Sequence, residues 1–168
     1  MSDLPPDDLH RNLARATADD GVHVSLAGDT YTILVSGADT DGRFTLIDML
    51  VPAGGGPPPH RHDFEETFVI LEGAIEVTFR GETSVVGAGE TVNVPANAPH
   101  SFRNASAGPA RLLCTCSPAG QEEFFLAVGD RVATRTSPPP QLDDAARAER
   151  MARAVELAPR YRTELLKP

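Results

Sequence analysis

Short runs of apolar and β-branched residues, separated by glycine, proline, asparagine and aspartate, fill the chain between residues 22 and 116. Runs of this length at regular spacing are typical of antiparallel β-strands. No segment of helical length lies between them, which argues against the helical crossovers that a parallel sheet requires. The pattern therefore predicts an all-β sandwich, barrel or jelly roll with about eight strands, at residues 31–35, 44–51, 67–71, 75–79, 84–86, 91–94, 100–102 and 111–116.

Apolar residues recur at helical spacing in three segments outside this region, at residues 5–18, 120–132 and 143–158. We expect the last helix to pack through one apolar stripe and to turn its arginines to solvent. This stripe comprises Ala148, Met151, Ala152 and Val155. We therefore expect an N-terminal helical arm (1–20), a β-barrel (21–120) and a C-terminal helical extension (121–168).

The chain is acidic, with 24 aspartates and glutamates against 15 lysines and arginines and a net charge of −9. Binding to a nucleic-acid backbone needs clustered lysine and arginine to displace counterions, so we expect no nucleic-acid partner. The first residues have neither the basic nor the apolar part of a secretion signal, and no run is long enough to span a membrane. These features predict a cytoplasmic protein that does not bind membranes.

Two cysteines, Cys114 and Cys116, lie two positions apart in an apolar run. They are too few and too close to form a disulfide framework, which favours a reducing compartment. Both share strand parity with Leu112 and are expected to face the barrel interior. We interpret them as small buried apolar side chains rather than metal ligands, because ligation would require them to lie beside the histidines.

Three histidines and a glutamate form the strongest candidate for chemistry. His60 and His62 share one face of an extended strand, on which both imidazoles can reach a single ion. Glu66 shares parity with the apolar side chains of the next strand, and an unpaired buried carboxylate is costly. His100 lies on a distant strand that only a closed antiparallel fold can bring close. A divalent metal bound by all four would account for the pattern.

The same residues resemble both sequence motifs of the cupin family. The first motif is matched in full by Gly54, His60, His62, Glu66 and Gly73. The second is matched by Gly89, Pro95, Asn97, His100 and Asn104, with Asn97 in place of the usual glycine. Asparagine also tolerates the left-handed backbone conformation. The resemblance implies a cupin jelly-roll barrel, or double-stranded β-helix, whose metal ligands are His60, His62, Glu66 and His100.

The C-terminal segment is similar to that of single-domain quercetin 2,3-dioxygenase-like cupins, so we expect a metal-dependent dioxygenase acting on a small aromatic or enolic substrate. A non-oxidative isomerase or lyase, and a binding or sensor module without catalysis, are the alternatives. We expect one Fe, Mn, Ni, Co, Cu or Zn ion per chain, since imidazole and carboxylate donors suit all of these. Glu66 is the candidate catalytic base.

Five phenylalanines could contact the substrate or simply fill the barrel: Phe64, Phe68, Phe102, Phe124 and Phe125. Neighbouring strands also have apolar residues of both parities, Val69 and Leu71 in one and Ile75 and Val77 in the next. These cannot all face the interior of one barrel. The second apolar face predicts a homodimer formed by packing of sheets.

Overall fold

The computed structural model describes residues 3–7 and 9–167. Two sheets face each other, and every strand pair in them is antiparallel. The first sheet has the strand order β11-β1-β2-β3-β10-β5-β8 and the second has the order β12-β4-β9-β6-β7. The strands are β1 Val22–Leu26, β2 Asp29–Val35, β3 Thr45–Val51, β4 His60–His62, β5 Glu65–Glu72, β6 Ala74–Phe79, β7 Glu82–Gly87, β8 Thr91–Val94, β9 His100–Arg103, β10 Ala110–Ser117, β11 Asp130–Val132 and β12 Thr163–Leu165. The predicted all-β jelly roll with helical extensions is confirmed in its class and in all eight predicted strands.

Alternation along the strands places the core between the two sheets. In β10, Leu112, Cys114 and Cys116 are fully buried, while the residues between them are partly exposed. Ile75 and Val77 of β6 also face inward. Val69 and Leu71 of β5, together with Val85 of β7, remain exposed on the outside. The apolar residues of β6 therefore fill the core, whereas those on the outside of β5 and β7 are exposed. Homodimer formation through this outer face stays a prediction.

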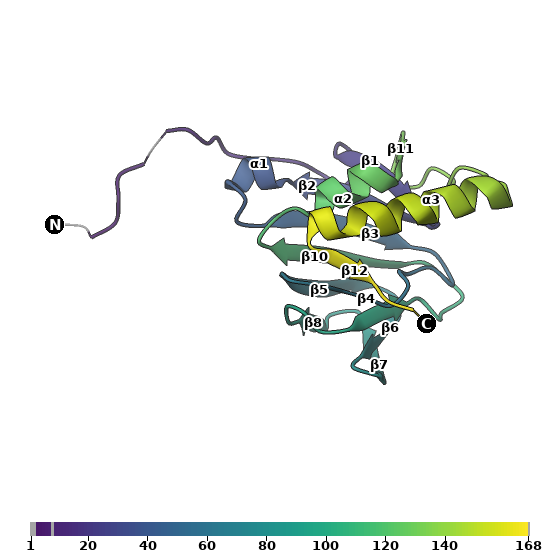
Figure 1. Cartoon of the computed structure of the whole chain (residues 1–168). Helices are drawn as coiled ribbons and strands as arrows, with labels where there is room; N and C mark the ends of the chain where they lie inside the picture. The colour runs from purple at the N-terminus through teal and green to yellow at the C-terminus, as the bar shows by residue number, and fades with distance from the viewer. Residues whose placement is uncertain (1–2, 8, 168) are drawn as a thin grey trace.

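The helices gather on one side of the barrel, where α2 and α3 lie beside each other (Figure 1). They are α1 Gly37–Thr40, α2 Gln121–Val128, α3 Asp144–Leu157 and the 3-10 helix η1 Ala158–Tyr161. Asp143 begins α3 by accepting a hydrogen bond from the amide of Ala146 at 2.8 Å. No helix among the described residues has the length and apolar character needed to cross a membrane.

The face through which α3 packs differs from the predicted stripe. Met151 and Val155 are 52% and 54% exposed. The less exposed positions are Ala146, Arg150, Ala154 and Leu157. Arg150 lies among them because its guanidinium pairs with the carboxylate of Asp130 in β11. The predicted orientation is therefore wrong for Arg150, which the ion pair with β11 holds against the barrel, whereas Arg147 and Arg153 are exposed as predicted.

The predicted N-terminal helix is also wrong for the residues that the structure describes within 5–18. This segment runs away from the barrel without helical turns (Figure 1). Leu9 and Leu13, which supply the apolar residues at helical spacing in this segment, are 82% and 93% exposed. A short helix depends on packing of its apolar face for most of its stability. Here that face meets no surface of the barrel.

Asn104, the last residue of the second motif, links the ends of several strands. Its amide donates to the carbonyls of Val51 at 2.9 Å and Gly108 at 2.8 Å. Its side-chain oxygen accepts from the backbone amide and the hydroxyl of Ser106. The side chain is fully buried, and its donors and acceptor are all used. The role of this motif residue is therefore to connect the end of β3 with the loop between β9 and β10.

We expect Asn104→Ala to lower the free energy of unfolding by about 2–4 kcal/mol, because it leaves buried backbone groups without hydrogen bonds. Urea denaturation followed by circular dichroism would measure the loss. Asn93→Ala is the matched control, since Asn93 is exposed and bonds only to side chains on the surface. Equal urea midpoints for the two variants would contradict this role.

Candidate metal centre

Opposite sheets bring the four predicted ligands together inside the barrel. His60 and His62 come from β4 and His100 from β9, with His60 paired directly to His100 in register. Glu66 reaches them from β5 in the other sheet. One donor atom from each of the four residues lies within 4.8 Å of the others, and all four side chains are buried. The structure thus juxtaposes the predicted ligands as a cluster that could hold a metal ion.

Backbone carbonyls fix the orientation of all three imidazoles. The Nδ1 atoms of His60, His62 and His100 each lie 2.9 Å from a carbonyl oxygen, those of Pro58, Phe64 and Ala98 respectively. A carbonyl only accepts hydrogen bonds, so each Nδ1 is the protonated donor nitrogen. In their neutral form, the rings present the lone pairs of their Nε2 atoms to the centre of the cluster. Carbonyl contacts of this kind are typical of histidines that bind metals.

The carboxylate makes this arrangement one that needs a proton or a metal ion between Glu66 and the imidazoles. Oε2 of Glu66 lies 3.1 Å from Nε2 of His62 and 3.1 Å from Nε2 of His100. Lone pairs facing a carboxylate at this distance repel each other unless a proton or a metal ion lies between them. Adjacent ligands on an octahedral ion with bonds of about 2.1 Å are separated by about 3 Å. The donor types and their spacing therefore fit a divalent transition metal.

The charges of the cluster are strongly coupled. Burial, and to a smaller extent the charge of the nearby His100, lower the pKa of His60 to about 4. Burial acts to lower the pKa of His100 too, but the hydrogen bond to Glu66 and its negative charge outweigh it and raise the value. Burial acts to raise the pKa of Glu66, whereas contacts with His100 and His62 hold it well below its usual range. Glu66 is thus an ionised donor despite its complete burial.

The two cysteines lie directly behind Glu66. Cys114 Sγ is 3.3 Å from Oε1 of Glu66, the oxygen that faces away from the imidazoles, and Cys116 Sγ is 3.9 Å from the same oxygen. Their interpretation as buried interior residues is consistent with the structure. Their position, however, is beside the cluster rather than remote from it, because β10 pairs with β5 so that Cys116 is opposite Glu66.

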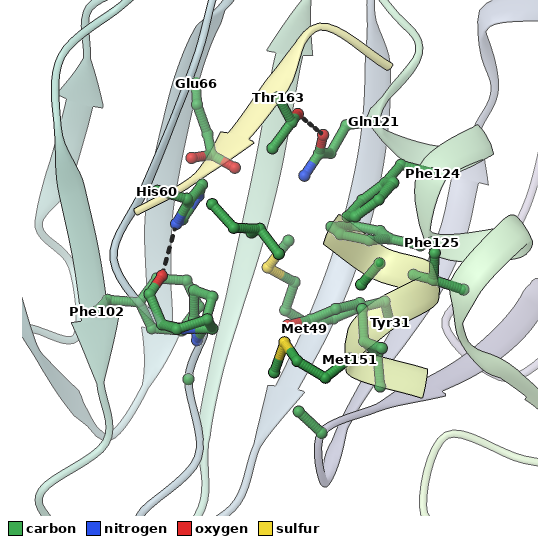
Figure 2. A pocket seen from close by; sticks show the side chains of 18 residues that line it. Tyr31, Met49, His60, Glu66, Phe102, Gln121, Phe124, Phe125, Met151 and Thr163 are labelled. Carbon is green, nitrogen blue, oxygen red and sulfur yellow. Dashed lines mark hydrogen bonds between the residues drawn. The ribbon is translucent and has the colours of Figure 1, made fainter. Parts of the chain in front are cut away.

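An apolar cavity of about 100 Å³ opens onto His60 and Glu66. Figure 2 shows these two residues on one side of it, with Phe124 and Phe125 on the other and Met49 between. Three of the five predicted phenylalanines, Phe102, Phe124 and Phe125, line the cavity. The small volume and the apolar wall suit a compact, largely apolar molecule next to the donor cluster.

The other two phenylalanines have contacts outside the lining of this cavity. Phe64 stacks on His62 with ring centroids 3.8 Å apart, which helps to fix that imidazole. Phe68 packs edge-on against Phe102 at 5.3 Å. The structure therefore gives these residues packing roles, as the core-filling interpretation expected.

Several residues at the cavity were not recognised from the sequence as site residues. Gln121 of α2 and Thr163 of β12 bring polar groups to its rim, and Tyr31 and Met151 complete its walls. Thr163 is there because β12 pairs with β4, opposite His62. The alternation of β2 could have identified Tyr31 as an interior residue. No local signal in the last residues of the chain indicates that they return to the metal-binding strand.

The two antiparallel sheets form a jelly roll. Three imidazoles and a carboxylate meet in its interior and form a candidate metal centre. Residues 47–116 match the family model described as Cupin domain. This segment of the chain is therefore a cupin domain, and the chain resembles quercetin 2,3-dioxygenase-like cupins.

Two curated proteins are similar in sequence to part of this chain. It is 27% identical over 128 residues to quercetin 2,3-dioxygenase of Bacillus subtilis, covering 76% of this chain and 37% of that protein. It is 36% identical over 100 residues to the HTH-type transcriptional regulator PuuR of Escherichia coli, covering 60% of this chain and 54% of the regulator. The chain thus spans well under two thirds of either protein.

A solved structure supports the fold independently. An RmlC-like cupin from Shewanella frigidimarina superposes with a TM-score of 0.58 at 17% identity, over 68% of this chain and 99% of that one. At this level of identity the similarity establishes the architecture alone. The activity must be argued from the residues of the site.

Proposed function

We propose that the protein is a metal-dependent dioxygenase of the quercetin 2,3-dioxygenase-like type that acts on a small aromatic or enolic substrate. The observation that carries this proposal is the set of three imidazoles and a carboxylate next to an apolar cavity. Four protein donors leave two positions open on an octahedral ion, whereas a structural zinc site is normally closed and rich in thiolate. The similarity to the Bacillus quercetin 2,3-dioxygenase supports the same class.

His60, His62, Glu66 and His100 would hold one divalent ion per chain. Such an ion supplies Lewis acidity toward a hydroxyl or enol oxygen of the substrate. Glu66 would accept the proton of that oxygen. The Nδ1 contacts keep the imidazoles in place while the proton moves.

The cavity defines the size of the proposed substrate. Pockets for drug-sized ligands measure roughly 300–1,000 Å³, several times the volume of about 100 Å³ found here. We therefore favour an acyclic enolic diketone or a single-ring compound over a multi-ring flavonol. Phe102, Phe124 and Phe125 would surround its apolar part, and Gln121 would lie near its polar end.

Oxygen uptake by the purified full-length chain tests the proposal. With a panel of enolic diketones, single-ring enols and flavonols, we expect consumption of O₂ that stops on chelation and returns when metal is restored. Phe124→Leu should raise KM roughly fivefold, for a loss of about 1 kcal/mol of apolar contact. Phe79→Leu, which lies outside the cavity lining, is the control. A fully metallated protein that consumes no O₂ across the panel would overturn the proposal.

A binding or sensor module without catalysis is the second candidate, favoured by the similarity to the E. coli transcriptional regulator. For such a module, a ligand would raise the melting temperature with or without metal and would be recovered unchanged. An isomerase or lyase would instead convert the substrate equally well without oxygen. The cytoplasmic location and the homodimer stay predictions, and sedimentation equilibrium would measure the latter.

A further inference from the structure

The two thiols and the second oxygen of Glu66 form a compact triangle of donor atoms. Cys114 Sγ and Cys116 Sγ are 3.6 Å apart, and they lie 3.3 and 3.9 Å from Oε1 of Glu66. All three side chains are buried, and their donor atoms form a second group close enough to hold an ion. The imidazoles of His62 and His100 contact the other oxygen, Oε2. The two donor sets therefore share a residue but use different atoms of it.

The dimensions of the triangle match tetrahedral coordination. Metal–sulfur bonds of about 2.3 Å place two tetrahedral sulfur ligands about 3.8 Å apart, and a carboxylate oxygen with a bond of about 2.1 Å lies about 3.6 Å from each sulfur. The observed edges of 3.3, 3.6 and 3.9 Å lie close to these values. Small movements of the side chains would bring all three atoms onto one ion.

A disulfide is the alternative use of two neighbouring thiols, and the strand geometry disfavours it. Cys114 and Cys116 lie on the same face of the continuous strand β10. Residues two apart on a strand have Cα atoms about 6.6 Å apart, close to the upper limit of about 6.8 Å for a disulfide. An ion between the sulfurs needs no such approach of the backbone.

We propose that Cys114, Cys116 and Oε1 of Glu66 form a second metal site, which binds a thiophilic ion with a filled d shell, such as Cu(I), Zn(II) or Cd(II). Thiolates select such ions, whereas the imidazole and carboxylate set also accepts harder ions such as Mn(II). On binding, each thiol releases its proton to solvent and no electron is transferred. The cupin domain would then carry two donor sets of different metal preference on the two sides of one carboxylate.

Titration with Cd(II) tests this site, because a cadmium–thiolate bond gives a charge-transfer band in the near ultraviolet. The full chain is first loaded with Mn(II), a harder ion for the imidazole set, and kept reduced with a phosphine. We expect the band to saturate at one Cd(II) per chain. It should persist in the His60→Ala/His100→Ala double variant, so failure of the imidazole site would not hide the thiol site.

Cys114→Ser and Cys116→Ser should each lower the band by half or more and weaken Cd(II) binding at least about tenfold. Circular dichroism and Mn(II) loading would verify that these variants fold, with Cys114→Ala and Cys116→Ala as replacements if serine is not tolerated. A full-intensity band in either single variant would contradict the proposal that both thiols bind the same ion. The absence of any band in the wild-type protein after equilibration would overturn the site itself.

Discussion

His100→Ala is expected to reduce the metal content of the purified protein from close to one ion per chain to a small fraction. The substitution removes one of the four donors and the contact between His100 and Glu66. Changes to groups that merely support a ligand cost about 10–100-fold in affinity, so the loss of a ligand should cost at least as much. Elemental analysis would measure the occupancy.

Melting temperature gives a second readout of the same change. A ligand at about 100 times its Kd stabilises a protein by about 2.7 kcal/mol, and this contribution should disappear in the variant. Added metal should therefore raise the melting temperature of the wild-type protein but not that of His100→Ala. His10→Ala, on the exposed N-terminal segment, is the control. Unchanged occupancy in His100→Ala and in the corresponding His60→Ala would contradict the ligand assignment.

Asp29→Asn is expected to stabilise the protein at alkaline pH. Asp29 is buried in β2 and accepts a hydrogen bond from the hydroxyl of Tyr31 at 2.9 Å. Burial raises its pKa from 3.8 to about 7, although Tyr31 and the backbone of Gly56 act to lower it. The folded protein thus keeps a proton that the unfolded chain loses above pH 4. The contribution of protonated Asp29 to the free energy of unfolding is present below pH 4 and is lost as the pH rises through 7.

The difference between the pKa values of Asp29 in the folded and unfolded states corresponds to a loss of unfolding free energy of at most about 4 kcal/mol, at roughly 1.36 kcal/mol per pKa unit. Asparagine has no proton to lose and still accepts from Tyr31, so its advantage should grow between pH 4 and 8. Urea denaturation at several pH values would measure it, with Asp3→Asn as the exposed control. If Asp29→Asn is equally or less stable than the wild type at pH 8, the protonated state of Asp29 is contradicted.

Local patterns predicted the strands well because alternation is a property of each strand alone. They predicted a helix through residues 130–132, where β11 pairs with β1 instead. They also did not predict β12, whose three residues pair with β4. The failure at the N-terminal segment has the opposite cause, since the helical pattern of Leu9 and Leu13 is present but these side chains do not pack on the barrel. Contacts between distant segments decided these cases.

At the candidate site too, local patterns predicted some features, and contacts between distant segments decided the others. The spacing of His60, His62, Glu66 and His100 predicted a cluster that the structure brings together. The carbonyl contacts that orient the rings could not be predicted, because they depend on the path of the loops before and after β4 and β9. Nor could the contact of Cys114 with Glu66, which depends on the register between β10 and β5.

The pairing of β12 with β4 has a consequence for the order of folding. The ion pair between Arg61 and Glu164 in these strands joins residues 103 positions apart. Closing so long a loop costs entropy that must be recovered from contacts formed elsewhere first, and distant pairings slow folding. The strand that carries His60 and His62 is therefore expected to gain its outer neighbour late, after most of the two sheets has assembled.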